Sequence, residues 1–484
     1  MQKIAILAAA PPAPASDAMA SGGGNPIVGL LVILLVVALL MYLVYRGMDA
    51  MLGCCIAACV VALGNSLNVY ESMMGAFWTG ACNVITSMGF TLILSCLLGQ
   101  IYLRTGAVDS IGALFQRFFV GNSTGITMKL RSAYAYFFVS LVLCICGMNV
   151  YVAVFCLIPM GITIFRKADI PKRSTAGMLA GTLAIACCCP GTPLYTNVLA
   201  SAFFGTNSTA ALIPGLLGAA AMLLLNVLWI RSFVNKADKN GDHFVEEKPS
   251  ASAGGMPPEG PPPVPADTGE RKLPNPWLAL LPLVLNVILY GFVGWAIEPT
   301  LILSILLAIL IFLPYFARED SRKLPVKSIN SALTAGAAAA APVILVMAAQ
   351  MGYAAIVSAT SAFGMVIGIF SGLPLPAELT FGIFASISGF LSGDSIAGLA
   401  FSSNVFLPMA ETIGVSTGAM HRIALFAVSI LDTIPICGGV IAMLRASGMT
   451  HKEGYGPIFR TSVVYVAIGM LVCIVACMLF PGLT

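Results

Sequence analysis

The chain has 484 residues, of which 59% are hydrophobic and only 9% are charged, and its formal net charge is +4. A soluble domain has about a quarter of its residues charged, because its surface must be solvated. This composition therefore excludes a soluble protein and requires lipid around the chain, and the small net charge gives no indication of nucleic-acid binding.

Apolar segments long enough to cross a bilayer, which takes about 20 residues, follow one another along most of the chain. In the first half they lie at 27–45, 50–68, 77–103, 132–165, 174–203 and 210–230. In the second half they lie at 277–296, 300–316, 332–358, 379–410, 420–446 and 461–481. They predict an all-α polytopic membrane protein.

Two polar intervals lie outside these segments. Residues 1–26 form an amino-terminal tail that we expect to be exported, and its short apolar run leaves a cleaved leader as the alternative. Residues 231–276 are first charged and then Pro-rich, a composition that cannot bury itself. We expect them to be a flexible linker between a first membrane repeat at 27–230 and a second at 277–484.

Lysine and arginine divide the connections into two groups. They gather around Arg46 and in the intervals 104–131, 166–173, 231–272, 318–327 and 445–460. Neither residue occurs in the connections 66–76, 203–209, 297–300, 371–378 and 411–419. Because Lys/Arg-rich loops stay in the cytoplasm, we expect a protein of the bacterial cytoplasmic (inner) membrane with the linker inside and the amino terminus outside.

Two long apolar segments begin and end on the same side of this pattern. Segment 132–165 has basic residues beyond both ends, so it must enter from the cytoplasm, turn near Gly147 and return. Segment 379–410 has none at either end and turns near Gly393. The sequence therefore predicts two re-entrant hairpins that enter the membrane from opposite faces.

An apolar segment interrupted by glycine and proline follows each hairpin, at 189–193 and at 433–439. The two halves agree in the order of their segments, in spacing and in loop charge. Each half makes about five crossings, an odd number, so the second half is inverted relative to the first. We expect inverted repeats, each with one re-entrant hairpin and one interrupted helix.

The breaks predict a binding site near the middle of the membrane. A broken helix exposes N–H and C=O groups, which are tolerated at that depth only inside protein or around a water-filled cavity, and the N-terminus of a half-helix suits an anion. The alternative is that individual hydroxyls only cap the helix ends. The expected substrate contacts are Asn149, Thr192, Thr196, Asn197, Ser392, Gly393, Ser395 and Thr433.

Four charged or titratable residues lie close to the second hairpin and the second interruption. Asp394 and Asp432 are carboxylates inside apolar segments, which marks them as functional candidates, and we expect one of them to carry the coupling proton. The alternative is a structural partner for backbone amides or for His421 or Arg422. His421 and Arg422 could neutralise an arriving anion or lie at the interface, but we expect a local pairing with Asp432 or the outer loop.

The 14 cysteines predict no metal site and no cofactor. Most lie in apolar runs, and none shows zinc spacing with the chain's three histidines. For Cys187, Cys188 and Cys189 we expect a tightly packed segment, with a soft-metal site as the alternative. These cysteines have no nearby histidine to act as a base, and the linker has no nucleotide-binding glycine loop, so we expect no enzyme.

The stretch from His421 to Lys452 resembles the carboxyl-terminal signature of the gluconate permease family. The matching residues are Met420-His421-Arg422-Ile423-Ala424, Leu431-Asp432-Thr433-Ile434-Pro435 and Gly448-Met449-Thr450-His451-Lys452. Weaker similarities are Gly99-Gln100 with Thr105-Gly106, and the Pro190 to Pro193 region. The chain departs from the family pattern at Cys187 to Cys189, at Ile436-Cys437 and at Asp394, which points away from gluconate itself.

The resemblance implies the ion transporter superfamily fold, a homodimer paired through scaffold helices, and proton-coupled uptake of gluconate-like sugar acids, D-serine or short hydroxy- or keto-carboxylates. With the reading of the breaks, it predicts a secondary active transporter that imports a small organic anion across the bilayer by alternating access. A sodium-coupled carboxylate symporter is the first alternative, and an anion channel is the second.

Overall fold

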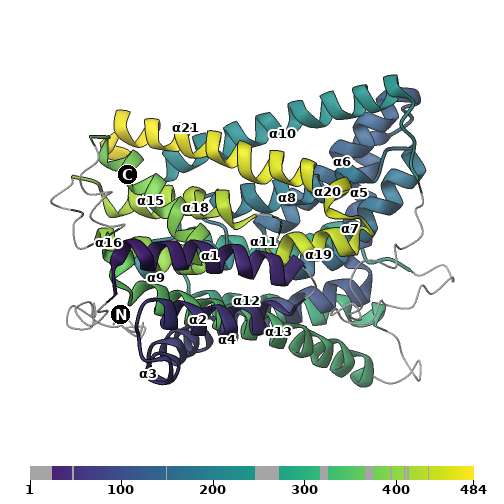
Figure 1. The fold of residues 1–484 in the computed structure, drawn as a ribbon. Helices are drawn as coiled ribbons and strands as arrows, with labels where there is room; N and C mark the ends of the chain where they lie inside the picture. Colours follow the sequence, from purple (N-terminus) through teal and green to yellow (C-terminus); the bar gives the residue numbers. More distant parts are fainter. Residues whose placement is uncertain are drawn as a thin grey trace.

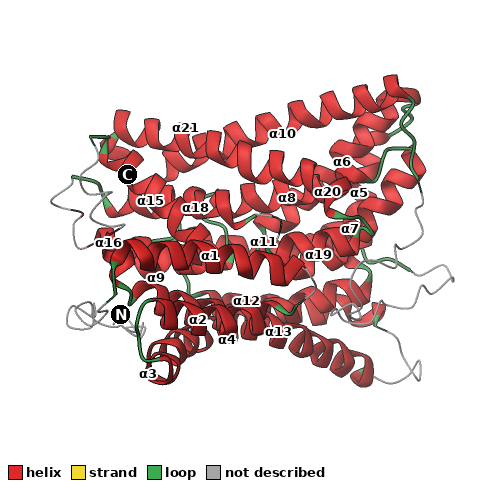
Figure 2. Ribbon diagram, viewed as in Figure 1, coloured by secondary structure: helices red, strands yellow, loops and turns green. Residues whose placement is uncertain are grey.

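Every regular element of the described chain is a helix (Figure 2). The computed structural model describes residues 24–45, 48–148, 150–245, 272–316, 325–365, 374–392, 395–407, 410, 414–433, 435 and 437–484. Six helical segments are long and apolar enough to cross a membrane. The predicted class, an all-α polytopic membrane protein, is confirmed.

The first half contains ten α-helices and one π-helical segment in its described residues. They are α1 (Pro26–Tyr45), α2 (Ala50–Gly64), α3 (Val69–Ser72), η2 (Met73–Phe77), α4 (Trp78–Thr105), α5 (Ala107–Val120), α6 (Gly125–Ile145), α7 (Val150–Ala168), α8 (Arg173–Cys188), α9 (Tyr195–Phe204) and α10 (Leu212–Asn240). The α8 and α9 helices flank the predicted first break.

The second half follows the same order. Its described helices are α11 (Pro276–Val287), η3 (Ile288–Phe292), α12 (Ile297–Phe312), η4 (Leu313–Tyr315), α13 (Val326–Ser358), α15 (Ala377–Ser392), α16 (Ser395–Phe406), α18 (Thr417–Asp432), α19 (Gly438–Ala446), α20 (His451–Phe459), η6 (Arg460–Val464), α21 (Tyr465–Leu479) and η7 (Pro481–Leu483). The α18 and α19 helices flank the second break.

Several helices begin at residues whose side chains satisfy the free amides of the first turn. Asp49, Asn275 and Ser416 accept hydrogen bonds from amides in the first turns of α2, α11 and α18. Thr450 and Glu453 form a capping box at the start of α20. These short polar residues interrupt apolar runs, so the local sequence fixes where one helix stops and the next begins.

Helix boundaries differ from the sequence prediction at several places, and α5 and α10 show the reasons. Helix α5 occupies part of the connection predicted at 104–131, because its buried Val108 and Ile111 lie on one helical face while Asp109 and Phe118 are exposed. Helix α10 continues to Asn240, ten residues into the predicted linker, since exposed charged residues extend a helix beyond its apolar part. Residues 1–23 and 246–271, which hold most of the tail and the linker, lie outside the described residues.

The two segments predicted as re-entrant hairpins each contain a pair of helices in contact, at opposite ends of the bundle (Figure 1). Helices α6 and α7 contact each other on the right of this view, and α15 and α16 contact each other on the left. Helix α8 lies to the right and α9 to the left, whereas α18 lies to the left and α19 to the right. The interrupted helices therefore run in opposite directions through the middle of the molecule.

The packing of one half repeats in the other. Helix α1 packs on α2 as α11 packs on α12, and α2 packs on α13 as α12 packs on α4. Arm α7 of one hairpin contacts α19, and arm α16 of the other contacts α9. The α4–α13 and α10–α21 pairs join the two halves. Through the α9–α16 and α7–α19 contacts, each interrupted helix packs against the predicted hairpin of the opposite half.

Glycines allow the helices that join the halves to approach closely. A Cβ atom added at Gly218 of α10 would lie 2.8 Å from the carbonyl oxygen of Gly469 in α21. One at Gly336 of α13 would lie 2.7 Å from the Cα atom of Leu97 in α4. Small residues are the usual means of close helix contact in membranes, where lipid provides no hydrophobic drive for association.

Candidate functional site

The first break is dictated by proline and glycine. Proline disfavours the helical conformation of the residue before it, and Cys189, which precedes Pro190, is extended with ψ 129°. Gly191 has a φ of 76°, which L-residues with a side chain rarely adopt. Thr192 Oγ1 donates to the carbonyl of Ala186 at 2.9 Å and so caps the end of α8. The Thr192 hydroxyl is therefore bound to protein at this position.

Asn197 of α9 joins the break to its surroundings and is fully buried. Its Nδ2 donates to the carbonyls of Thr192 at 2.9 Å and Ser208 at 3.2 Å. These two bonds fix the orientation of the amide, so its Oδ1 accepts from His421 Nε2 at 3.1 Å and Arg422 Nη1 at 3.4 Å. All of the hydrogen-bonding capacity of this side chain is used within the protein.

Arg422 of α18 is also fully buried, and each of its N–H groups has an acceptor. Nε donates to the carbonyl of Ala210 at 3.1 Å, and Nη2 donates to Ser208 and Ala210 at 3.0 and 2.9 Å. Nη1 donates to the carbonyl of Cys188 at 3.3 Å as well as to Asn197. The guanidinium therefore ties the end of α8 to the loop before α10, through neutral acceptors.

His421 completes this network from the neighbouring position. Since Nε2 donates to Asn197, the neutral ring has an unprotonated Nδ1, which accepts from the hydroxyl of Thr206. The ring stacks on Phe204, with the ring centroids 6.3 Å apart. Both His421 and Arg422 are thus buried against the loop after α9. The side chain of Asp432, the other expected partner, lies outside the described residues.

Two other predicted contacts have hydroxyls without a partner in the described chain. Thr196 and Ser395 are 2% and 1% exposed, and neither hydroxyl oxygen makes a hydrogen bond there. Thr196 lies in the first turn of α9 and Ser395 in the first turn of α16, and these two helices contact each other. Tyr195 and Ile396 pack in one apolar cluster with α4 and α13. Helices α9 and α16 therefore contact each other, and each carries in its first turn a buried hydroxyl with no partner among the described residues.

At the second break, the described residues show two hydrogen bonds to backbone carbonyls. The carbonyl of Thr433 accepts from Tyr455 Oη at 3.1 Å, and the carbonyl of Pro435 accepts from His451 Nε2 at 2.6 Å. Thr433 itself is half-buried, and its hydroxyl is 3.5 Å from the carbonyl of Ser462. Both donors come from α20, in the same half of the chain.

Five predicted site residues cannot be placed. Asn149, Gly393 and Asp394 lie outside the described residues, and so do the side chains of Ser392 and Asp432. In the part of the chain that is described, no group of three metal-ligating side chains lies together. Cys188 is buried with its Sγ near the carbonyl of Leu425, at 3.9 Å.

One acid near the first break was missed by the sequence reasoning. Glu298, in the first turn of α12, is half-buried, and its Oε1 accepts from Thr91 Oγ1 of α4 at 2.8 Å. The adjacent segment η3 packs on the break, since a Cβ atom added at Gly291 would lie 2.5 Å from the carbonyl oxygen of Gly191. The available signal was an acid at the start of an apolar run with no basic residue nearby.

Comparison with known proteins places the chain beside transporters. No family model matches it. The uncharacterized transporter YxjC of Bacillus subtilis (strain 168) is 25% identical over 476 residues, which cover 89% of this chain and 94% of that protein. The crystal structure of the Alcanivorax borkumensis YdaH transporter covers 94% of this chain and 98% of its own at 14% identity, with a TM-score of 0.49. The chain is thus similar over nearly its whole length to a protein named as a transporter.

Proposed function

We propose that the protein is a secondary active transporter that imports a small organic anion together with protons by alternating access. Two independent observations support this proposal. The chain is similar to a transporter along most of its length. It also has two helix breaks inside an apolar bundle, which are tolerated in a membrane only where protein or a cavity surrounds the free backbone groups.

The observation that carries the proposal is a pair of buried hydroxyls, at the starts of α9 and α16, that have no partner among the described residues. Buried hydroxyls normally find a hydrogen-bond partner, and a carboxylate would supply one to both Thr196 and Ser395. The positive ends of the two helix dipoles favour the same ligand. Arg422 lies behind the first break with every N–H engaged, so it contributes positive potential without contacting the substrate.

A small carboxylate fits this arrangement better than a larger or multiply charged anion. Two hydroxyls and two helix ends balance about one negative charge, since each helix end carries roughly half an elementary charge. We therefore propose a short hydroxy- or keto-carboxylate or a sugar acid as the substrate class, in agreement with the resemblance of the His421 to Lys452 stretch.

Proton coupling requires an acid that changes its protonation during the cycle. Asp394 and Asp432 are the candidates from the sequence, and Glu298 is added because it follows segment η3, which packs on the first break, and binds Thr91. Replacing each acid by its amide keeps the hydrogen-bonding shape while removing the titration. We expect one of the three variants to retain substrate exchange but lose accumulation driven by a proton gradient.

Uptake by reconstituted protein tests the proposal. A thermal-shift screen of purified protein against C3 to C6 carboxylates first selects the ligand. Proteoliposomes then receive it under an inward proton gradient or an inward sodium gradient. We expect saturable accumulation with protons alone. Accumulation that needs a sodium gradient would show that sodium, not the proton, is the coupling ion. A conductance that does not saturate would favour a channel. The absence of flux for every ligand tested would overturn the proposal.

A further inference from the structure

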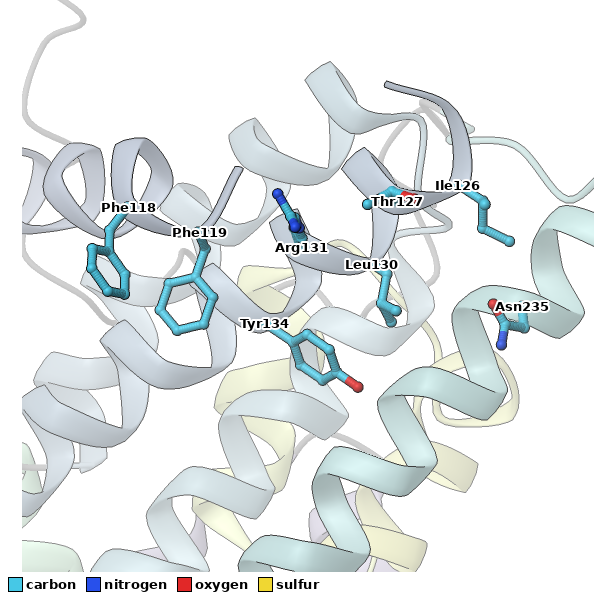
Figure 3. Close-up of a pocket in the computed structure, with 8 residues that line it drawn as sticks. All are labelled: Phe118, Phe119, Ile126, Thr127, Leu130, Arg131, Tyr134 and Asn235. Carbon is cyan, nitrogen blue, oxygen red and sulfur yellow. The ribbon is translucent and has the colours of Figure 1, made fainter. Parts of the chain in front are cut away.

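A groove lies between α5, α6 and α10, and none of its lining residues belongs to either break (Figure 3). Its volume is about 490 Å³. Phe118 and Phe119 of α5 line one side, and Tyr134 of α6 faces Asn235 of α10 on the other. Arg131, one turn before Tyr134, lies between the two sides. The lining is therefore mixed, with apolar side chains from Phe118, Phe119, Ile126 and Leu130 and polar groups from Thr127, Arg131, Tyr134 and Asn235.

The apolar side is a fixed row of aromatic rings. Phe119 stacks between Phe115 and Phe138, with ring centroids 6.2 and 5.4 Å apart. Tyr134 lies against Phe138 at 6.5 Å, and its hydroxyl donates to the carbonyl of Val227. Phe118 is 83% exposed at the end of this row. Such a surface on a membrane protein suits the upper methylenes of an acyl chain.

The groove is also positively charged. Arg131 is exposed, and its Nη1 donates to Ser123 Oγ at 2.6 Å without meeting a carboxylate in the described chain. Arg117 is exposed in the last turn of α5, and the exposed Arg231 lies one turn before Asn235 on α10. None of the lining residues is acidic. Positive charge beside an apolar row matches a ligand with a negative head and an apolar tail.

The groove lies at the end of the bundle where lysine and arginine gather, the end predicted to face the cytoplasm. Anionic lipids make that leaflet negative and attract basic segments close to it. We propose that the groove binds an anionic phospholipid, with its phosphate on Arg131 and its acyl chain along Phe118, Phe119 and Tyr134. A soluble anion would gain nothing from the aromatic row, and a neutral lipid would gain little from the arginines.

Native mass spectrometry of the delipidated full chain tests this assignment with two lipids that share the same acyl chains. We expect phosphatidylglycerol to be retained at least about fivefold better than phosphatidylcholine, a factor typical of one basic side chain near a charged surface. Arg131→Gln should bring the two lipids to within twofold. Lys452→Gln removes an exposed charge from α20 at the same end of the bundle and should keep the preference.

A second variant tests whether the lipid binds in the groove or elsewhere on the protein surface. Thr127→Phe places a ring in the groove and keeps every charge, so it should lose retention of phosphatidylglycerol while its thermal unfolding midpoint matches the wild type. Equal retention of both lipids by the wild type, or an unchanged preference in Arg131→Gln or Thr127→Phe, would overturn the proposal. So would complete displacement by soluble glycerol phosphate.

Discussion

The two interrupted helices share their place in the fold but are held in different ways. At the first break, the buried side chains of Asn197, His421 and Arg422 join α8, α9, α18 and the loop before α10. At the second break, in the part that the structure describes, the half-buried Tyr455 and His451 donate hydrogen bonds to the backbone carbonyls of Thr433 and Pro435. Because helix order and packing repeat between the halves, the difference comes from side chains rather than from topology.

This difference assigns the two breaks different mechanical properties. A buried network in which every group is bonded is strong at low dielectric, and opening it exposes a buried charge. Single hydrogen bonds from half-buried groups cost less to open. We therefore expect the first break to act as a fixed platform for the start of α9, and the second break to carry the conformational change.

Arg422→Met should have the largest effect, because it removes the guanidinium donors from the carbonyls of Cys188 and Ala210 and one of the donors to the carbonyl of Ser208. We expect the free energy of unfolding, measured by sodium dodecyl sulfate titration, to fall by about 3–5 kcal/mol. Arg422→Lys keeps the charge with three donors and should recover part of the loss. A methionine variant as stable as the wild type would show that the network does not hold the break.

Thr196→Val and Ser395→Ala should give the opposite pattern. Each hydroxyl has no partner in the described chain, so stability should stay within about 0.5 kcal/mol while substrate affinity falls about tenfold, the value of one hydrogen bond to a charged ligand. Isothermal titration with the carboxylate found by thermal shift measures this.

Two matched variants control that experiment. Thr175→Val in α8 and Ser304→Ala in α12 remove buried hydroxyls that also lack a partner in the described chain but lie away from both breaks. They should leave affinity unchanged. If the controls weaken binding as much as the site variants do, the unpaired hydroxyls do not mark the binding site.

Tyr455→Phe should have a smaller effect that is confined to the second break. It removes one hydrogen bond to the carbonyl of Thr433, worth about 0.5–1.5 kcal/mol. Hydrogen exchange should accelerate at residues 435–440 and stay unchanged at 189–197. Tyr134→Phe removes a comparable bond between α6 and α10 and should alter neither segment. Faster exchange at the first break would contradict the separation of the two regions.

The smallest effect on stability should come from the hydrogen-bonded group around Asp169, which lies outside both breaks. Asp169 lies between α7 and α8, and a hydrogen bond from His243, with further bonds from the amide of Phe244 and from Lys129, lowers its pKa to about 2. An unfolded aspartate has a pKa of about 3.9. The stabilisation is therefore complete above about pH 4 and is lost as the pH falls from about 4 to 2.

Solvent limits the size of this effect, since the Asp169 side chain is 44% exposed. We expect less than about 1 kcal/mol, measured as the change in unfolding midpoint between pH 5 and pH 2.5. Asp169→Asn should flatten this part of the pH profile and leave substrate affinity unchanged. A pH dependence of the same size in the asparagine variant would assign it to other carboxylates.

Much of the fold could be predicted from the sequence because lipid imposes a simple rule. A long apolar run must be a helix in a membrane, so the helices α1, α2, α4 and α10 to α13 follow from hydropathy. Proline and glycine place the breaks, at Pro190 and Pro435, for local steric reasons. Helix α5 escaped this reasoning, since its alternation of apolar and polar residues is a signal of 3.6-residue periodicity rather than of a spanning run.

The candidate site could be predicted only in part. The sequence placed hydroxyl and amide residues near the breaks, but it treated Thr192, Thr196 and Asn197 alike. Thr192 is bound to its own helix end, Asn197 is bound on all sides, and Thr196 is free in the described chain. The partner of Thr192 is local, but the amide oxygen of Asn197 is bound by His421 and Arg422, more than 200 positions away, and no local pattern records such a pairing.

By itself, the sequence determined that this chain is a membrane protein and where its helices run. It also determined which connections carry the basic residues and where the helices are broken. Each of these follows from the chemistry of neighbouring residues. Only the tertiary structure decided that His421 and Arg422 are buried supports of the first break, that Thr196 and Ser395 belong to two helices in contact, and that Glu298 binds Thr91. These are contacts between segments that are distant in the sequence. They are determined by how the helices pack and not by the local composition of either segment.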